Sequence, residues 1–312
     1  MPKKQRARRP GSRPNGRVPA PKRTPRTAPR EKVFLLGGRR LNRFDLYELA
    51  VQAPAMEAAF VRAVHGGNPR TLCEDFCGPA SVARAWCALH PRFDAVAVDR
   101  DPVPLAHARA RAAEHDQTRN DTTLTRLRLK MQDVLSARGR ADIIASFNFA
   151  VCELHQRDHL LAYLRSAKKR LKRGGVLVAD LYGGPGSLAP SATARRIPTE
   201  GGTLMYRWEQ RRVDPLTARV VNAIHFILPG KGPAKSRTFR DAFVYDWRLW
   251  TVAELRDAML EAGFAATEVY NSYGDAVDSD GNLYVRPCAT DDEPGEPHEL
   301  GENFVVYIAG RV

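Results

Sequence analysis

Acidic, amide and glycine residues follow several apolar segments in the first half of this 312-residue chain. After the first of these segments, residues 73–80 read CEDFCGPA, an acid followed by a short turn that contains a glycine. Backbone N–H groups in a tight turn can approach a ligand closely, and the start of the next helix favours a negatively charged group such as a carboxylate. The turn therefore predicts a ligand site, with Glu74, Cys77 and Gly78 as candidate binding residues.

Comparable positions follow the next three apolar segments. Asp99-Arg100 ends the second segment, 21 residues after Gly78, where nucleotide-binding α/β folds carry an acid that binds ribose hydroxyls. Asp133-Val134 follows the third segment, and a carboxylate there can accept a hydrogen bond from an adenine amino group. Asn148 follows the fourth segment, where we expect a reacting group. Each position also has a structural alternative: a turn glycine, a solvated strand end, a helix cap or a loop amide.

These residues need a scaffold that gathers them, and the sequence predicts one in which strands and helices alternate. The predicted strands are 71–74, 93–99, 124–131, 141–148 and 176–181, and the helices between them are 79–89, 102–115 and 158–172. This alternation implies parallel βαβ units with helices on both faces of one sheet. Such a sheet binds ligands at the carboxyl ends of its strands, where the strand order reverses. Two further helices, 44–52 and 56–64, precede the first strand.

The alternation is interrupted after the fifth strand. Three segments with a period of two residues, 204–213, 219–228 and 239–249, predict a mostly antiparallel sheet inserted over residues 185–249. A capping box at Thr251–Glu254 then opens a helix to residue 262, and strands at 266–273 and 304–309 complete the pattern. We therefore predict an α/β fold with three Rossmann-like layers. Its sheet has seven mostly parallel strands and the inserted antiparallel segment.

In this order, the four polar positions resemble those of class I S-adenosylmethionine-dependent methyltransferases, and the resemblance covers roughly residues 33 to 312. The first motif of that family is usually Asp/Glu-x-Gly-x-Gly-x-Gly. Glu74 matches the acid and Gly78 the middle glycine, whereas Phe76 and Ala80 stand where the other two glycines are expected. The variant is similar to a bacterial subgroup whose first motif reads Glu-Asp-Phe-Cys-Gly.

The resemblance implies S-adenosylmethionine as the cofactor and methyl transfer as the reaction. Glu74 and Gly78 would line the methionine end of the cofactor, Asp99 would hold the ribose, and Asp133 would hold the adenine. The other implied cofactor contacts are Cys77, Arg100, Val134 and Asn148. Methyl transfer from a sulfonium needs mainly the alignment of two reactants. No metal site is expected.

The methyl acceptor is expected to be a small molecule, modified on nitrogen or oxygen. The inserted segment is the expected wall of the acceptor site, and we predict that it sets the choice of substrate. Asn148 and Tyr245 are the candidate catalytic residues. The candidate substrate contacts are Tyr206, His225 and Arg248 in the insertion and Tyr47, which lies in an N-terminal helix that could fold over the site as a lid.

The formal charge of +14 is concentrated at the N-terminus. Residues 1–30 contain eleven Lys and Arg, seven Pro and no acid, which leaves +3 for the rest of the chain. Self-repulsion and low hydrophobicity predict that residues 1–31 form a disordered basic tail. Nonspecific nucleic-acid contact through this tail keeps two alternatives open: an RNA methyltransferase guided by the tail, and a nonenzymatic nucleic-acid-binding protein on a methyltransferase fold.

Several other classes are disfavoured. Five cysteines without a CxxC pair predict reduced thiols in the cytoplasm rather than a disulfide framework or a zinc site. No apolar run is long enough to span a bilayer. The Gly-x-Gly-x-x-Gly turn of nicotinamide-dependent oxidoreductases is missing after the first strand. Cys152 and His155 have the spacing of a nucleophile pair on a helix, but a buried thiol beside a helix start is the favoured interpretation.

Overall fold

The computed structural model describes residues 33–36, 38–119, 123–228, 236–274, 276–277, 283–291 and 300–312. The chain divides into two units, Met1–Glu31 and Lys32–Val312, and the predicted disordered tail lies outside the described residues. Within the described ranges, no helix has the length and apolar character needed to cross a membrane.

The central sheet of the second unit has eight strands in the order β15-β12-β16-β7-β6-β3-β4-β5. Strands β3 to β7 run parallel, and β16 pairs antiparallel with both β7 and β12. All seven predicted strands are present, and β15 adds a two-residue edge. The strand bounds are β3 (Thr71–Asp75), β4 (Asp94–Asp99), β5 (Leu127–Met131), β6 (Ala141–Ser146), β7 (Leu171–Gly183), β12 (Ala266–Tyr270), β15 (Ala289–Thr290) and β16 (Phe304–Arg311).

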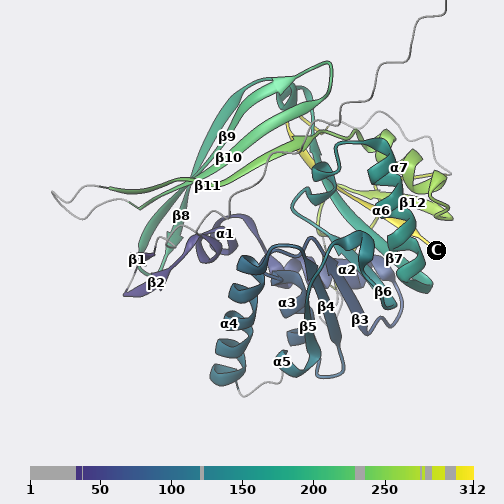
Figure 1. The fold of residues 1–312 in the computed structure, drawn as a ribbon, viewed down its shortest axis with the longest axis horizontal. Coiled ribbons are helices and arrows are strands. Elements are labelled where there is room, and N and C mark those ends of the chain that lie inside the picture. The colour runs from purple at the N-terminus through teal and green to yellow at the C-terminus, as the bar shows by residue number, and fades with distance from the viewer. Residues whose placement is uncertain are drawn as a thin grey trace, which may run out of the picture. The chain divides into compact units, whose positions relative to one another are not determined.

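Helices cover both faces of this sheet, which confirms the predicted three layers (Figure 1). One hydrophobic core contains residues of α2 (Pro54–His65), α3 (Ser81–Leu89) and α4 (Pro102–Arg119), and the other contains residues of α6 (Arg157–Arg170) and α7 (Val252–Glu261). Adjacent strand residues alternate between the two cores, as Ile143 and Ile144 of β6 do. Because parallel strands are buried on both faces, they are apolar throughout rather than alternating.

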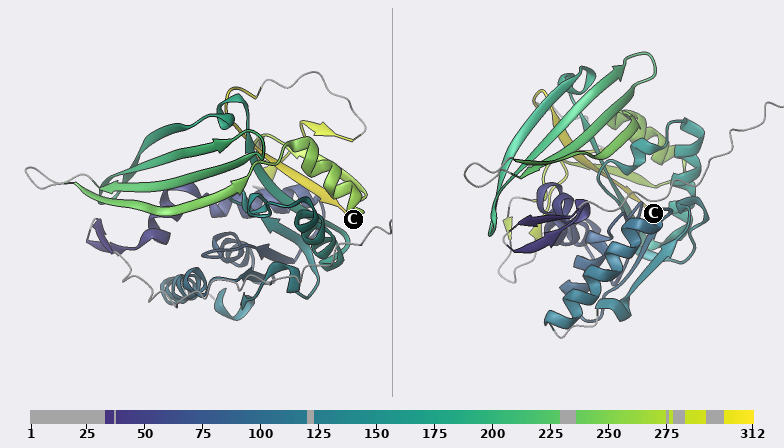
Figure 2. Two further views of the ribbon diagram at one scale, coloured as in Figure 1. Left: turned by 45° about the horizontal axis from the view of Figure 1, so that its top comes forward. Right: turned by 60° about the vertical axis from the view of Figure 1, so that its left-hand side comes forward.

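The inserted segment forms a separate antiparallel sheet in the order β11-β10-β9-β8. Its strands are β8 (Ser191–Thr199), β9 (Gly202–Asp214), β10 (Arg219–Leu228) and β11 (Arg237–Arg248). One face packs against α1 (Arg43–Val51) and the hairpin β1 (Phe34–Leu36)–β2 (Arg39–Leu41) in a third hydrophobic core, and Figure 2 shows the sheet lying over α1. The Tyr182 hydroxyl near the end of β7 bonds Gln210 and Asn222, so the insertion reaches the carboxyl edge of the main sheet.

The remaining elements are short. They are α5 (Thr123–Arg126), β13 (Ala276–Val277), β14 (Leu283–Tyr284) and the 3-10 turns η1 (Val134–Ser136), η2 (Ala150–Glu153) and η3 (Pro185–Leu188). The strand predicted over 124–131 is therefore helical at its start and begins only at Leu127.

The helix predicted over 158–172 ends at Arg170, and β7 begins directly at Leu171. The Lys172 ammonium bonds Thr71 and Asp142, and the backbone around Gly174 pairs with the last residue of the chain. Gly174 has a positive φ of 73° beside a shift in strand register, so it permits an irregularity in β7 rather than ending the helix.

Candidate active site

The turn after β3 holds three alternate residues in the left-handed region. Phe76, Gly78 and Ala80 have φ values of 53°, 50° and 53°, at the spacing of the three glycines of the first motif. An L-residue pays roughly 1–2 kcal/mol in this region, whereas glycine adopts it freely. Backbone bonds from Cys77 N to Val98 O (3.0 Å) and from Ala80 N to Cys77 O (2.8 Å) hold the turn. The glycine-type backbone path is thus kept although two glycines are replaced.

Asp99 connects this turn to the end of β4. Its Oδ2 accepts a hydrogen bond from Gly78 N and its Oδ1 accepts one from Asp101 N, both at 2.8 Å. Its backbone carbonyl accepts a bond from Gln132 N at 2.9 Å, which brings the end of β5 alongside. A Cβ at Gly78 would meet no other atom within 4 Å, so the turn is open on that side. The predicted cofactor positions at the ends of three strands are therefore neighbours.

The other predicted cofactor residues differ in their accessibility. Asp133 is exposed, and its side chain caps η1 by accepting a bond from Leu135 N at 2.8 Å, so the helix-cap alternative describes its contact here. Val134 beside it is buried. Cys77 is buried, and burial raises the pKa of its thiol. Arg100 is exposed and pairs with Glu153 at 3.3 Å.

Glu74 is directed into the protein. It is 4% exposed, and its Oε2 accepts a hydrogen bond from Ala83 N at 2.7 Å in the first turn of α3. Burial raises the pKa of this carboxyl to about 8, although the backbone bond opposes the shift. The N-terminus of α3, where we expected a negatively charged ligand group, thus receives Glu74 in this structure.

A second strained turn follows β6, where Asn148 and Phe149 both have a φ of 61°. The Asp180 carboxylate in β7 holds this turn by accepting bonds from Asn148 N (2.9 Å) and Phe149 N (2.7 Å). Asp180 is buried, and burial raises the pKa of its carboxyl to about 7. The sequence interpretation missed Asp180, although a lone acid within an apolar strand is a usable signal because an unpaired buried charge is costly.

Four of the predicted site residues meet at this second turn. The Tyr47 hydroxyl of α1 donates a hydrogen bond to Asn148 Oδ1 at 3.1 Å. Tyr47 also interacts with Tyr245 of β11 and, electrostatically, with Tyr206 of β9. Burial raises the pKa values of Tyr47 and Tyr245 above the usual range of a phenol, so both remain protonated donors at neutral pH. Helix α1 therefore lies beside the turn after β6, and the role of Tyr47 as a substrate contact stays a prediction.

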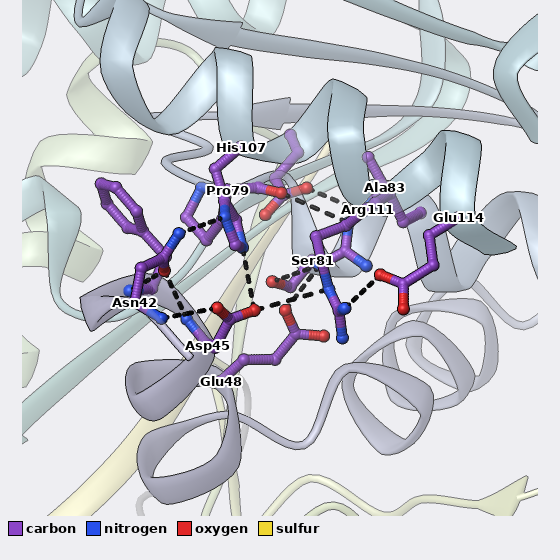
Figure 3. A network of polar contacts seen from close by, with 12 residues as sticks. Asn42, Asp45, Glu48, Pro79, Ser81, Ala83, His107, Arg111 and Glu114 are labelled. Carbon is purple, nitrogen blue, oxygen red and sulfur yellow. Dashed lines mark hydrogen bonds and ion pairs between the residues drawn. The ribbon is translucent and has the colours of Figure 1, made fainter. Parts of the chain in front are cut away.

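Helix α1 is attached to the two helices beside the first turn. Figure 3 shows Asp45 between His107 and Arg111 of α4, at 3.7 Å and 3.6 Å respectively. Glu48 pairs with Arg84 of α3 at 2.7 Å, and Arg84 also bonds the carbonyl of Pro79 in the turn. These contacts fix the helix that carries Tyr47.

Two predicted substrate residues lie apart from this cluster. His225 alternates with the buried Ile224 and Phe226, so it faces the opposite side of the inserted sheet. There its Nε2 meets Glu209 at 2.9 Å. Arg248 at the end of β11 bonds the carbonyl of His155 at 3.2 Å and lines a separate pocket of about 800 Å³.

Cys152 and His155 do not form a nucleophile pair. Cys152 is fully buried, and burial raises the pKa of its thiol far above neutrality. His155 Nε2 instead lies 2.7 Å from the carbonyl of Asp246. The structure describes all five cysteines, and none of them forms a disulfide.

Solved structures similar to this chain share its fold. CalS10 from Micromonospora echinaspora, an amino pentose methyltransferase solved with S-adenosylmethionine, has a TM-score of 0.59 and 17% identity over 86% of this chain and 95% of its own. The sugar N-methyltransferase KedS8 from Streptoalloteichus has a TM-score of 0.57 and 17% identity over 95% and 99% of the two chains. An S-adenosylmethionine-dependent methyltransferase from Clostridium acetobutylicum has a TM-score of 0.58 and 16% identity over 85% of this chain and 96% of its own.

The sequence itself matches no family model, and it matches no curated protein significantly. Identities of 16–17% establish the fold alone. That fold is the α/β Rossmann-like fold of class I S-adenosylmethionine-dependent methyltransferases, with the inserted antiparallel sheet after the fifth parallel strand.

Proposed function

We propose that this protein is an S-adenosylmethionine-dependent methyltransferase that acts on nitrogen or oxygen of a small molecule. The observation that carries the proposal is the bond between Gly78 N and Asp99, which joins a turn with three left-handed residues to the end of the adjacent strand. The turn follows β3, and the order of the parallel strands reverses between β3 and its neighbour β6. Sheets of this α/β type bind nucleoside ligands at such a reversal.

The residues around the turn fit the cofactor. Asp99 would hold the ribose hydroxyls, the open side of Gly78 would let the backbone approach the ligand, and Asp133 with Val134 would meet the adenine. When bound, S-adenosylmethionine supplies a methyl group on a cationic sulfur. The Phe76 and Ala80 variant of the turn also supports membership in the bacterial subgroup with a Glu-Asp-Phe-Cys-Gly motif.

In methyl transfer, the protein itself would orient the two reactants and exclude water from the site. Asn148 Oδ1 can accept a hydrogen bond from an acceptor N–H or O–H, and the phenols of Tyr47 and Tyr245 can hold the rest of the acceptor. Alignment of two reactants can lower a barrier by about 7–11 kcal/mol. The names of CalS10 and KedS8, an amino pentose and a sugar N-methyltransferase, support a small-molecule acceptor. Free cysteines support a cytoplasmic location.

Calorimetry with S-adenosylmethionine and S-adenosylhomocysteine tests the cofactor assignment on the full-length protein. We expect both compounds to bind, and failure of both would contradict the proposal. A transfer assay with a radiolabelled methyl group, supplied with separate metabolite and RNA fractions of a cell, then tests the acceptor. Label in the metabolite fraction supports a small molecule, whereas label confined to RNA would show that the acceptor class is wrong.

The basic tail supports a second proposal, nonspecific contact with nucleic acid. Eleven cations in residues 1–30 would neutralise several phosphates, so affinity should fall by roughly 10³-fold or more between 50 and 200 mM salt. A gel shift with RNA and DNA of unrelated sequence would compare the full chain with a variant lacking residues 1–30. We expect the truncated protein to lose most of the affinity at low salt, and equal affinity of the two proteins would contradict this role.

A further inference from the structure

Glu57 of α2 is a buried acid whose hydrogen bonding is incomplete. It is 4% exposed. Its Oε1 accepts weak bonds from Ala53 N (3.4 Å) and from the Tyr273 hydroxyl (3.3 Å). Its Oε2 is buried without a hydrogen-bond partner in the described part of the chain. Because a carboxylate oxygen shut away from water normally has a donor, this oxygen indicates that a donor is still to be supplied.

Glu57 lies near the other acids at the carboxyl edge of the sheet. It interacts electrostatically with Glu74 at the end of β3 and with Asp180 in β7. Arg84 acts electrostatically on Glu74. Other titratable groups that interact with these three acids are Glu48, Tyr47, Tyr273, Tyr307, Cys77 and Cys152. No ion pair joins Glu57, Glu74 or Asp180 to a basic side chain within the described ranges. The cluster is therefore short of positive charge.

We propose that Glu57 binds the α-ammonium group of S-adenosylmethionine, an inference that rests on the proposed function. Of the two cationic groups of that cofactor, only the ammonium carries N–H donors, so it alone can satisfy the unpartnered oxygen. Glu57 belongs to α2, whose apolar residues pack in the core on the α2–α3 side of the sheet, and it interacts electrostatically with Glu74 at the end of β3. The acceptor-side residues Tyr47 and Tyr245 pack instead with the inserted sheet. This separation favours the cofactor over the acceptor as the source of the ammonium.

Proton release provides a signature of this contact. Burial raises the pKa of Glu57 to about 7 in the ligand-free protein, so a part of the molecules carries a proton there at neutral pH. An ammonium group beside the carboxylate favours the charged form and displaces that proton. Titration calorimetry at pH 7 in two buffers with different ionisation enthalpies measures the protons released. We expect release with the wild-type protein and a smaller release with Glu57→Gln.

A comparison of two ligands isolates the ammonium contact. S-adenosylhomocysteine carries the ammonium, whereas 5′-methylthioadenosine keeps the nucleoside and thioether but lacks the amino acid. Glu57→Gln keeps the shape of the side chain and removes its charge. We expect it to weaken S-adenosylhomocysteine binding at least ~10-fold and to leave 5′-methylthioadenosine binding unchanged. Glu261→Gln, which alters an exposed acid on α7, is the matched control and should affect neither ligand.

Thermal unfolding without ligand separates this role from a structural one. A carboxyl whose pKa is raised in the folded protein makes its full contribution to stability below its unfolded-state pKa. For Glu57 that contribution is lost as pH rises through its folded-state pKa of about 7. Glu57→Gln should therefore raise the melting temperature at pH 8 by on the order of 2 °C and raise it less at pH 5. A lower melting temperature at pH 8, or equal weakening of both ligands, would overturn the proposal. A wild-type protein that binds neither ligand would instead refute the proposed function.

Discussion

Replacement of Asp99 by alanine will reduce the affinity for S-adenosylmethionine and S-adenosylhomocysteine by at least ~100-fold. The carboxylate accepts two backbone bonds of 2.8 Å, from Gly78 N in the turn and from Asp101 N after β4. Hydrogen bonds to a charged group are worth roughly 1.5–3 kcal/mol each. Their removal releases a turn that two non-glycine residues already strain, and it also removes the proposed ribose ligand. Titration calorimetry measures the loss.

Asp94→Ala is the matched control for this change. Asp94 lies at the opposite end of β4 and is exposed, so its replacement should leave ligand affinity within about twofold of wild type. Circular dichroism would verify that both variants fold. If Asp99→Ala bound either ligand as tightly as the wild-type protein, the cofactor site would have to lie elsewhere.

The layers of the fold could be predicted because burial leaves a strong pattern. Parallel strands between two helical layers need apolar side chains on both faces, and β6 and β7 show this as Ala141–Ser146 and Val176–Leu181. The positions of Gly78, Asp99 and Asn148 followed from the same pattern, because each comes directly after a strand. The contact between Gly78 and Asp99 could be expected because neighbouring parallel strands end at the same edge of the sheet.

Contacts between distant segments could not be predicted in this way. Asp180 bonds backbone groups 31 and 32 residues away, and Tyr47 bonds a side chain 101 residues away. No feature of the sequence around these residues indicates which partners they bond. Strand β8 was missed for a different reason: residues 191–196 are all exposed, so the strand carries no pattern of burial.

The inserted sheet shows what cannot be predicted from the alternation of apolar and polar residues along a strand. Alternation indicates which residues share a face, but it does not indicate which face will be covered. Tyr206 and His225 were predicted together, yet they lie on opposite faces, with Tyr206 in the core and His225 bonded to Glu209. Shifts in register at Val221/Asn222 and Ile224/Phe226 further change which residues pair.

The insertion is also part of the main fold. Val220 and Trp247 of the inserted strands are buried in the same core as Leu177 and Leu181 of β7. Deletion of residues 186–248 would therefore expose the core of the main sheet as well as remove the proposed wall of the acceptor site. Tyr245 interacts with Tyr47, which bonds Asn148, and it is only partly buried where it packs against that core. A single replacement of Tyr245 therefore disturbs the core less than the deletion does and is the better test of whether the insertion sets substrate choice.

Asp180→Asn should lower turnover by about 100-fold while the affinity for S-adenosylhomocysteine changes less than threefold. The wild-type carboxylate accepts bonds from Asn148 N and Phe149 N with its two oxygens, whereas an amide offers one acceptor and places its NH₂ group against the other N–H. Both residues are held at a φ of 61°, so loss of one bond lets the turn relax and moves the Asn148 oxygen. Hydrogen exchange at the two amides, together with kcat and KM for the acceptor found in the labelling assay, measures this.

The pH profile and a matched control separate positioning from stability. The pKa of Asp180 is raised to about 7 by burial, and the protonated carboxyl accepts less well than the ionised one. Wild-type turnover should therefore rise as pH passes 7, and the Asn variant should not show this step. Asp142→Asn also removes a carboxylate that accepts two backbone N–H bonds, those of Arg70 and Thr71 at the opposite end of the sheet. It should lower stability without loss of turnover, and an equal loss of turnover in both variants would show that Asp180 does not position the reaction.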